Sequence, residues 1–209
     1  MKGASLRLIA PYAAWMVLMM ALPSAPWAYA VRTAVTLALL VTSWTCSRVA
    51  RGTMGDGSRV ARGTMVSLAS GLLVGLLVLV IWIAPDQLAW YRKFCVIGDP
   101  YSAPAPYDLA TAAPLTYAFL VIQLFGSAFV ISAAEELFFR KWLIGYAGFG
   151  WMVALFAIEH NRPVVAAICG VLYGVLYLRK GLFSAIVAHA TTNLGLGVFV
   201  LLTNRWEFW

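Results

Sequence analysis

Long hydrophobic runs follow one another along the chain, separated by short polar or basic segments. A helix that spans a membrane needs about 20 mainly apolar residues, and at least five runs reach or approach that length. We therefore predict an all-α, polytopic transmembrane bundle of about seven to eight helices, forming a single membrane domain over residues 1–209. The predicted long helices cover 6–22, 27–46, 66–84, 115–142 and 182–203, and two shorter ones cover 151–160 and 164–178.

The segments between the runs predict an orientation. Residues 47–65 contain the octapeptide SRVARGTM twice and carry four arginines. Cytoplasmic loops are enriched in Lys and Arg, so we expect this loop in the cytoplasm, together with the basic pairs Arg140-Lys141 and Arg179-Lys180. Residues 86–112 are rich in proline, and their acids outnumber their bases. This segment is the predicted external loop.

The overall composition agrees with a membrane protein. Hydrophobic residues make up 63% of the chain and charged residues 11%, with a mean hydropathy of +0.85, whereas soluble domains carry about 25% charged residues. The net charge of +7 comes from short loops, so nucleic-acid binding is not expected. The three cysteines have no metal-like spacing and predict no disulfide framework. The first apolar run is interpreted as a retained helix rather than a cleaved signal peptide.

Three polar clusters interrupt the apolar sequence after residue 130. They are Glu135-Glu136 with Arg140, Phe156 with His160, and His189 with Asn193. Ionisable residues are costly inside a membrane and are usually functional there. At about 1.5 Å per helical residue, Glu135, His160 and His189 lie roughly 8, 15 and 14 Å from the nearest predicted cytoplasmic helix end. We therefore expect one site in the inner half of the membrane, around a cytoplasm-facing cavity.

Helical geometry assigns these residues different tasks. Consecutive helical residues diverge by about 100°, so Glu135 and Glu136 point apart. Glu136 and Arg140 share a face and are expected to form an ion pair, which leaves Glu135 facing the cavity as a general base. His189 and Asn193 also share a face and could donate hydrogen bonds to an oxyanion.

The remaining residues of these clusters complete a site that could hydrolyse amides. Phe156 is interpreted as a packing residue that orients His160, and Glu159 is expected to bridge to Arg162 or Lys180. A glutamate and a histidine that activate water, opposite a His/Asn donor pair, suffice for amide hydrolysis.

Other functions fit some of the same residues. Two histidines and a glutamate could bind zinc, but the HExxH pattern is absent, so no cofactor is expected and zinc is not favoured. A non-catalytic membrane scaffold or immunity protein could keep these residues for structure. A transporter or proton relay could also use buried charges, but the sequence lacks the inverted repeats typical of transporters.

The three clusters together resemble the motifs of the CAAX prenyl endopeptidase and bacteriocin-processing family of glutamic intramembrane proteases. The resemblance covers residues 115–203 and implies that Glu135 and His160 activate water while His189 and Asn193 form the oxyanion hole. Glu136 and Arg140 would be supporting positions. Residues 189–197 and the terminal Trp206-Glu207-Phe208-Trp209 are similar to a bacterial subset that accompanies exosortase systems sorting PEP-CTERM-type proteins.

The resemblance also implies a cellular setting. We expect a multi-pass protein of a bacterial inner membrane, in contact with the lipid bilayer and with a membrane-associated protein or peptide as substrate. An exosortase is a further expected partner. Nothing in the sequence indicates a prenyl-binding groove, so lipidated substrates are not implied.

Overall fold

The computed structural model describes residues 2–49, 57–101 and 114–208, and within these ranges the regular secondary structure is entirely helical. Four helices there are long and apolar enough to cross a membrane. The predicted all-α, polytopic bundle is therefore confirmed. The elements, in chain order, are α1 (Lys2–Ala21), α2 (Pro26–Val49), α3 (Gly57–Ile83), η1 (Pro85–Gln87), α4 (Ala89–Cys95), α5 (Pro114–Phe125), η2 (Gly126–Ile131), α6 (Ser132–Glu135), η3 (Glu136–Leu143), α7 (Ile144–Ala147), α8 (Phe149–Ile158), α9 (Pro163–Lys180), α10 (Leu182–Thr203) and η4 (Trp206–Phe208).

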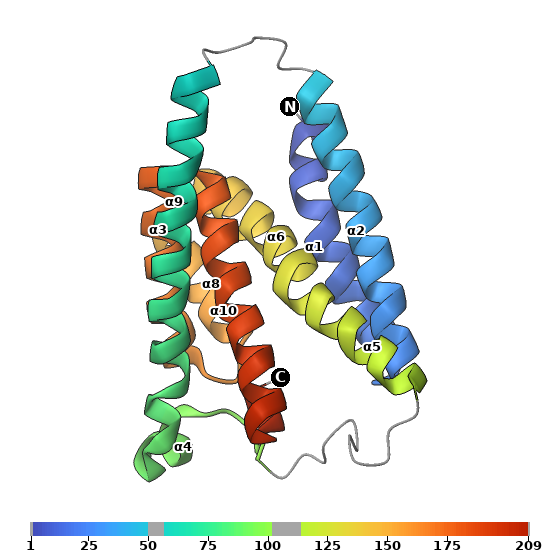
Figure 1. Cartoon of the computed structure of the whole chain (residues 1–209), viewed down its shortest axis with the longest axis vertical. Coiled ribbons are helices and arrows are strands. Elements are labelled where there is room, and N and C mark those ends of the chain that lie inside the picture. The colour runs from blue at the N-terminus through green and yellow to red at the C-terminus, as the bar shows by residue number, and fades with distance from the viewer. Residues whose placement is uncertain (1, 50–56, 102–113, 209) are drawn as a thin grey trace.

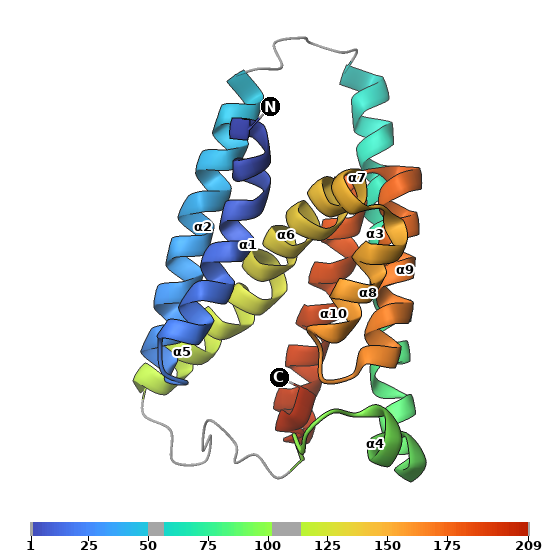
Figure 2. The same cartoon turned by 180° about the vertical axis from the view of Figure 1, so that it is seen from behind.

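The helices form two groups that one tilted helix connects. α1 packs against α2, while α3, α9 and α10 pack together with α8 against α9. The continuous helical stretch from α5 to α7 crosses diagonally from the first group to the second (Figures 1 and 2). This tilted stretch contacts α1, α2, α8 and α10, so its middle, which carries Glu135 and Glu136, lies where the two groups meet.

Two predicted boundaries are wrong. α2 extends to Val49 and α3 begins at Gly57, so much of the predicted 47–65 loop is helical. Alanine, arginine and methionine favour helix, which accounts for the longer helices. The middle of this loop, residues 50–56, lies outside the described residues. α9 has 18 residues, ending at Lys180, and is long enough to cross a membrane rather than being a short helix.

Glycines allow close helix packing at two contacts. A Cβ added to Gly75 in α3 would lie 2.5 Å from the Ala188 carbonyl oxygen of α10, so no larger residue fits without moving a backbone. On α9, a Cβ at Gly174 would meet Phe149 and Met152 of α8. Small residues four apart let a neighbouring helix approach closely, and on α9 the spacing of Ala166, Gly170 and Gly174 admits α8.

The tilted helix is not a plain α-helix. η2 and η3 have wide, π-helical turns on either side of the single α-turn of α6. Such turns are rare and frequently occur at functional sites. Asn193 of α10 donates a hydrogen bond from Nδ2 to the Ser127 carbonyl oxygen (2.9 Å) and another to Ser132 Oγ (3.1 Å). α10 therefore satisfies a main-chain acceptor of the wide turn.

A buried ion-pair network joins three distant segments at the end of the molecule where α3 and α10 terminate. Asp86, which is fully buried, accepts hydrogen bonds from Arg162 Nε (3.0 Å) and Arg205 Nη2 (3.0 Å) and from the Tyr101 hydroxyl (2.9 Å). Arg162 also donates to the Glu207 carbonyl oxygen (3.1 Å). We call this set the Asp86 network.

The Asp86 network corrects three expectations. Arg162 pairs with Asp86, not with Glu159. The turn between α8 and α9 lies against the predicted external segment, since the Ile97 amide donates to the Asn161 carbonyl oxygen (2.7 Å). Because His160 was expected roughly 15 Å from a cytoplasmic helix end, the turn after it was expected inside the membrane and not beside an external segment. Tryptophans that follow a membrane-spanning helix typically lie at the membrane interface, and this was the expectation for Trp206. It is instead buried against α10.

Candidate functional site

A buried charge cluster fixes the tilted helix against α10. Glu136 and Arg140 are fully buried and form the predicted ion pair, with Arg140 Nη1 3.0 Å from Glu136 Oε1. His189 Nδ1 lies 2.9 Å from the same carboxylate oxygen. The Arg140 guanidinium also lies over the Phe156 ring, 4.3 Å from its centroid. The Glu136 carboxylate therefore binds both Arg140 and His189 and holds these two side chains in position.

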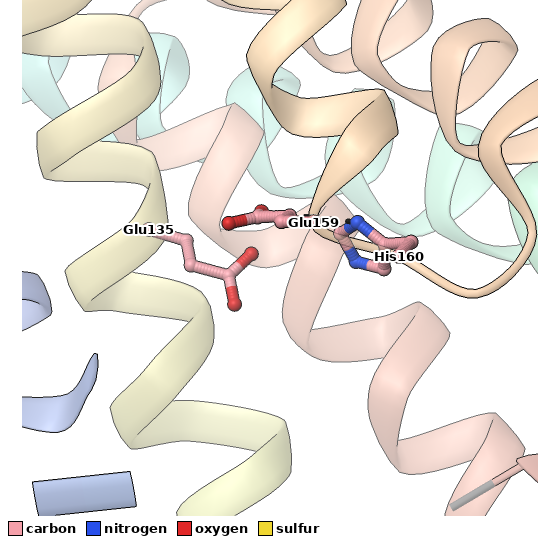
Figure 3. Close-up of side chains that lie close together, drawn as sticks. All are labelled: Glu135, Glu159 and His160. Atoms are coloured by element: carbon pink, nitrogen blue, oxygen red, sulfur yellow. Dashed lines mark ion pairs between the residues drawn. The ribbon is translucent and has the colours of Figure 1, made fainter. Parts of the chain in front are cut away.

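Glu135 points the other way, as predicted, and meets the end of α8. Its carboxylate converges with Glu159 and His160, and donor atoms from the three side chains lie within 4.8 Å of one another (Figure 3). The side chains are 13%, 16% and 23% exposed for Glu135, Glu159 and His160. The Glu159 residue as a whole is more exposed because its main chain lies at an open turn. We call these three residues the carboxylate–histidine cluster.

The first helix reaches this cluster. The Tyr12 hydroxyl of α1 donates a hydrogen bond to Glu159 Oε2. The Tyr12 ring stacks on Phe138 (centroids 4.7 Å apart) and meets Phe139 edge-on. Tyr12 is itself buried, so it fixes the Glu159 carboxylate from the opposite helix group.

Hydrogen bonding defines the tautomer of His160. Nδ1 lies 2.7 Å from the Phe156 carbonyl oxygen, and because a carbonyl oxygen only accepts, Nδ1 carries the hydrogen. In the neutral ring, Nε2 then keeps its lone pair and can accept a hydrogen bond from water. Phe156 also contacts the imidazole with its own ring (centroids 4.7 Å apart), in agreement with its predicted orienting role.

His189 and Asn193 both line the cavity, but their donors differ in availability. Nε2 of His189 lies 3.8 Å from Glu135 Oε2, so it faces the cluster. Both hydrogens of Asn193 Nδ2 are used, by Ser127 and Ser132. Donation to an oxyanion would require Asn193 to give up one of these bonds.

These residues enclose a cavity of about 180 Å³, which has room for water. Glu135, Phe156, His160, His189 and Asn193 are in its wall; its other residues are Trp82, Ser127, Cys169, Tyr173, Thr192, Leu196 and Phe208. Trp82 and Phe208 belong to the ends of α3 and of the C-terminal segment, away from the basic ends of η3 and α9. The cavity thus reaches toward the end opposite the basic helix ends, and the expectation of a cytoplasm-facing cavity in the inner half does not fit this arrangement.

Of the residues predicted for the site, Glu135, Phe156, His160, His189 and Asn193 line one cavity. Glu159 and Tyr12, which the structure adds to their surroundings, were not predicted there. Glu159 was assigned to a cation, and Tyr12 to an ordinary first helix. Tyr12 lies 147 positions from Glu159, so no local spacing could pair them. The one available signal was that Glu159 has no basic residue one helical turn before it.

The spacing of the carboxylate–histidine cluster would also admit a divalent cation, since two carboxylates and an imidazole are common donors. This combination differs from the predicted one, because Glu159 rather than His189 completes it. Cys95 and Cys169 are free thiols.

Comparison with protein families gives one match for this part of the chain. Residues 117–195 match the family described as type II CAAX prenyl endopeptidase Rce1-like. This match supports the CAAX protease family. The matched range runs from α5 into α10 and contains all three polar clusters, whereas Tyr12 and Asp86 lie outside it. Neither the curated proteins nor the solved structures gave a match. The family match and the long apolar helices together support a multi-pass membrane protein that is similar to this protease family over residues 117–195.

Proposed function

We propose that this chain is a glutamic intramembrane endopeptidase that hydrolyses a peptide bond of a membrane-associated protein or peptide. The observation that carries the proposal is the convergence of Glu135 and His160 on one cavity whose wall also includes His189. A carboxylate beside a neutral imidazole can hold and deprotonate water.

Each residue has a distinct task in this reaction. Glu135 accepts the proton of a water molecule that His160 Nε2 orients. The water oxygen attacks the scissile carbonyl carbon, and negative charge moves onto the carbonyl oxygen. His189 can stabilise that charge from Nε2 when it holds two protons, and the Glu136 carboxylate at Nδ1 then balances the imidazolium. Asn193 contributes if its Nδ2 gives up the hydrogen bond to the Ser127 carbonyl and donates to the substrate oxygen instead.

Glu135→Gln tests the assignment of the base. We expect hydrolysis to fall by at least about 100-fold, because an amide cannot accept the proton, while the protein remains folded and inserted. The measurement compares the termini of membrane proteins in cells that carry the wild-type chain, the variant or no chain. Asp99→Asn, at an exposed site, is the matched control. Wild-type cleavage products in the Glu135→Gln cells would disprove the proposal. If the termini are the same in cells with and without the chain, a non-catalytic scaffold is favoured.

A metal-dependent protease is the second candidate, favoured by the compact spacing of the carboxylate–histidine cluster. Treatment of the purified protein with a chelator separates the two. The glutamic mechanism predicts unchanged cleavage, whereas a metalloprotease would lose activity and regain it with zinc.

We also infer that the substrates belong to exosortase sorting in a bacterial inner membrane. The resemblance of residues 189–197 and of the C-terminal tryptophans to the exosortase-associated subset supports this inference. The same comparison of termini tests it, since the new termini should then lie in proteins that carry the sorting signal or in the exosortase.

A further inference from the structure

Peptide hydrolysis requires a proton for the leaving nitrogen as well as a base for water. An amide anion is a very poor leaving group, so general acid catalysis normally protonates the nitrogen as the C–N bond breaks. The proposed function assigns Glu135 to the proton of water and His189 to the oxyanion, and it assigns no separate residue to this second transfer. The inference below rests on that proposed function.

The Glu159 carboxyl group lies beside Glu135 and His160, which line the cavity. Figure 3 shows its carboxylate extending from the end of α8 toward the Glu135 carboxylate of the tilted helix, with the His160 ring beside it. Glu159 Oε2 accepts the Tyr12 hydroxyl hydrogen, whereas Oε1 lies 3.8 Å from His160 Nδ1. No Lys or Arg forms an ion pair with Glu159 among the described residues.

Two carboxylates this close in a largely buried site do not both ionise, since like charges destabilise one another and burial disfavours charge. Paired carboxyl groups that share one proton are an established way to combine an acid and a base in one site. We propose that Glu159 is a second catalytic carboxyl group, which Tyr12 positions and which protonates the leaving nitrogen.

The proton balance closes over one turnover. At the start the pair holds one proton, on Glu159. As the water O–H bond breaks and its oxygen bonds to the carbonyl carbon, Glu135 takes the released proton, so the pair holds two. Glu159 then gives its proton to the amide nitrogen, the C–N bond breaks, and the amine and the new carboxylic acid leave. One proton remains on Glu135. Its transfer to Glu159 restores the starting state.

A change of leaving group separates this role from a structural one. The probes are a quenched fluorescent peptide that spans a cleavage site found in the comparison of termini, and the 4-nitrophenyl ester of its acyl part. Nitrophenolate departs without a proton. For Glu159→Gln we expect kcat to fall at least about 100-fold on the peptide and about threefold or less on the ester, with little change in KM. Glu135→Gln should lose activity on both.

Tyr12→Phe tests whether the Tyr12 hydroxyl positions the Glu159 carboxyl group. Loss of one hydrogen bond to a carboxyl group should reduce kcat on the peptide about tenfold, again with the ester spared. Tyr146→Phe, at an exposed ring, and Asp99→Asn should match the wild type. Equal losses of Glu159→Gln on peptide and ester would overturn the inference while leaving Glu135 as base. Full activity of Glu135→Gln would instead overturn the proposed function.

Infrared spectroscopy of the purified protein tests the shared proton without any substrate. The C=O stretch of a protonated carboxyl group is distinct from the carboxylate bands. We expect one such band in the wild type that disappears in Glu159→Gln, changes in Glu135→Gln and shifts in Tyr12→Phe. A spectrum in which Glu159→Gln removes no protonated carboxyl band would overturn the inference.

Discussion

Arg140 illustrates how a single residue can hold a site together without entering the reaction. Its guanidinium is fully buried between the Glu136 carboxylate and the rings of Phe156 and Tyr173. A buried charge is tolerated only when it is paired. Because Glu136 also binds His189, the ion pair on the tilted helix sets the position of a histidine on α10.

Arg140→Leu should therefore be strongly destabilising. It leaves Glu136 buried without its cation, which costs about 3–5 kcal/mol. The double variant Glu136→Gln/Arg140→Leu removes both charges and should recover part of that loss. Thermal unfolding in detergent measures both, with Arg179→Leu at an exposed site as the control, expected within about 0.5 kcal/mol of the wild type. A double variant less stable than the single one would contradict this account.

At the level of helices and turns, the sequence predicts contacts between neighbouring residues but not contacts between distant ones. The hydrophobic runs predicted the helices, and the i,i+4 spacing predicted the Glu136–Arg140 pair, because both depend on neighbouring residues. The partners of Asp86 and Glu159 could not be predicted in this way, since 76 positions separate Asp86 from Arg162 and 147 separate Tyr12 from Glu159. Those contacts exist only once the helices have packed.

The wide turn of η2 was also beyond prediction, and it sets where Glu135 points. A π-turn holds an extra residue relative to an α-turn, and one residue corresponds to about 100° of helix rotation. Without η2, Glu135 and Glu136 would thus face other neighbours. The Asn193 bond to the Ser127 carbonyl stabilises the turn, so Asn193 influences the glutamates even before substrate is bound.

At the level of packed elements, Gly75→Ala should weaken the contact between α3 and α10. The new Cβ would lie 2.5 Å from a backbone oxygen and 2.6 Å from Thr191 Cβ, so the helices must separate. Overpacking of this kind costs about 1–3 kcal/mol. Gly145→Ala is the matched control, because nothing lies within 4 Å of its added Cβ, and it should be neutral or slightly stabilising. Equal melting temperatures for the two variants would refute the tight contact.

For the molecule as a whole, the Asp86 network connects segments that are distant in sequence. It joins the end of α3, the turn that follows His160 and the C-terminal segment. Phe208 of that segment stacks on Arg162 and Arg205, with ring centroids 4.5 and 4.7 Å from the guanidinium carbons, and also lines the cavity. The position of His160 thus depends on residues far outside the family match.

Asp86→Asn should reduce both stability and cleavage. The buried Arg162 would lose its carboxylate, at a cost of about 3–5 kcal/mol, while the partly exposed Arg205 would keep only Glu207. The turn bearing His160 would then lose its support. Thermal unfolding and cleavage of the peptide probe measure the two effects, with Asp99→Asn as the control. Unchanged stability would show that the arginines find other partners, which contradicts the network as described.

The same network has a consequence for the order of events during synthesis. A chain is made from its N-terminus, and its earlier parts can insert and pack first. Arg205 and Phe208 are translated after α10, the last helix of the described residues that is long and apolar enough to cross a membrane, yet they support the turn that carries His160. A nascent chain would therefore hold an incompletely supported His160 until these residues emerge. The turn that carries His160 would thus gain its full support only after α10 has been synthesised.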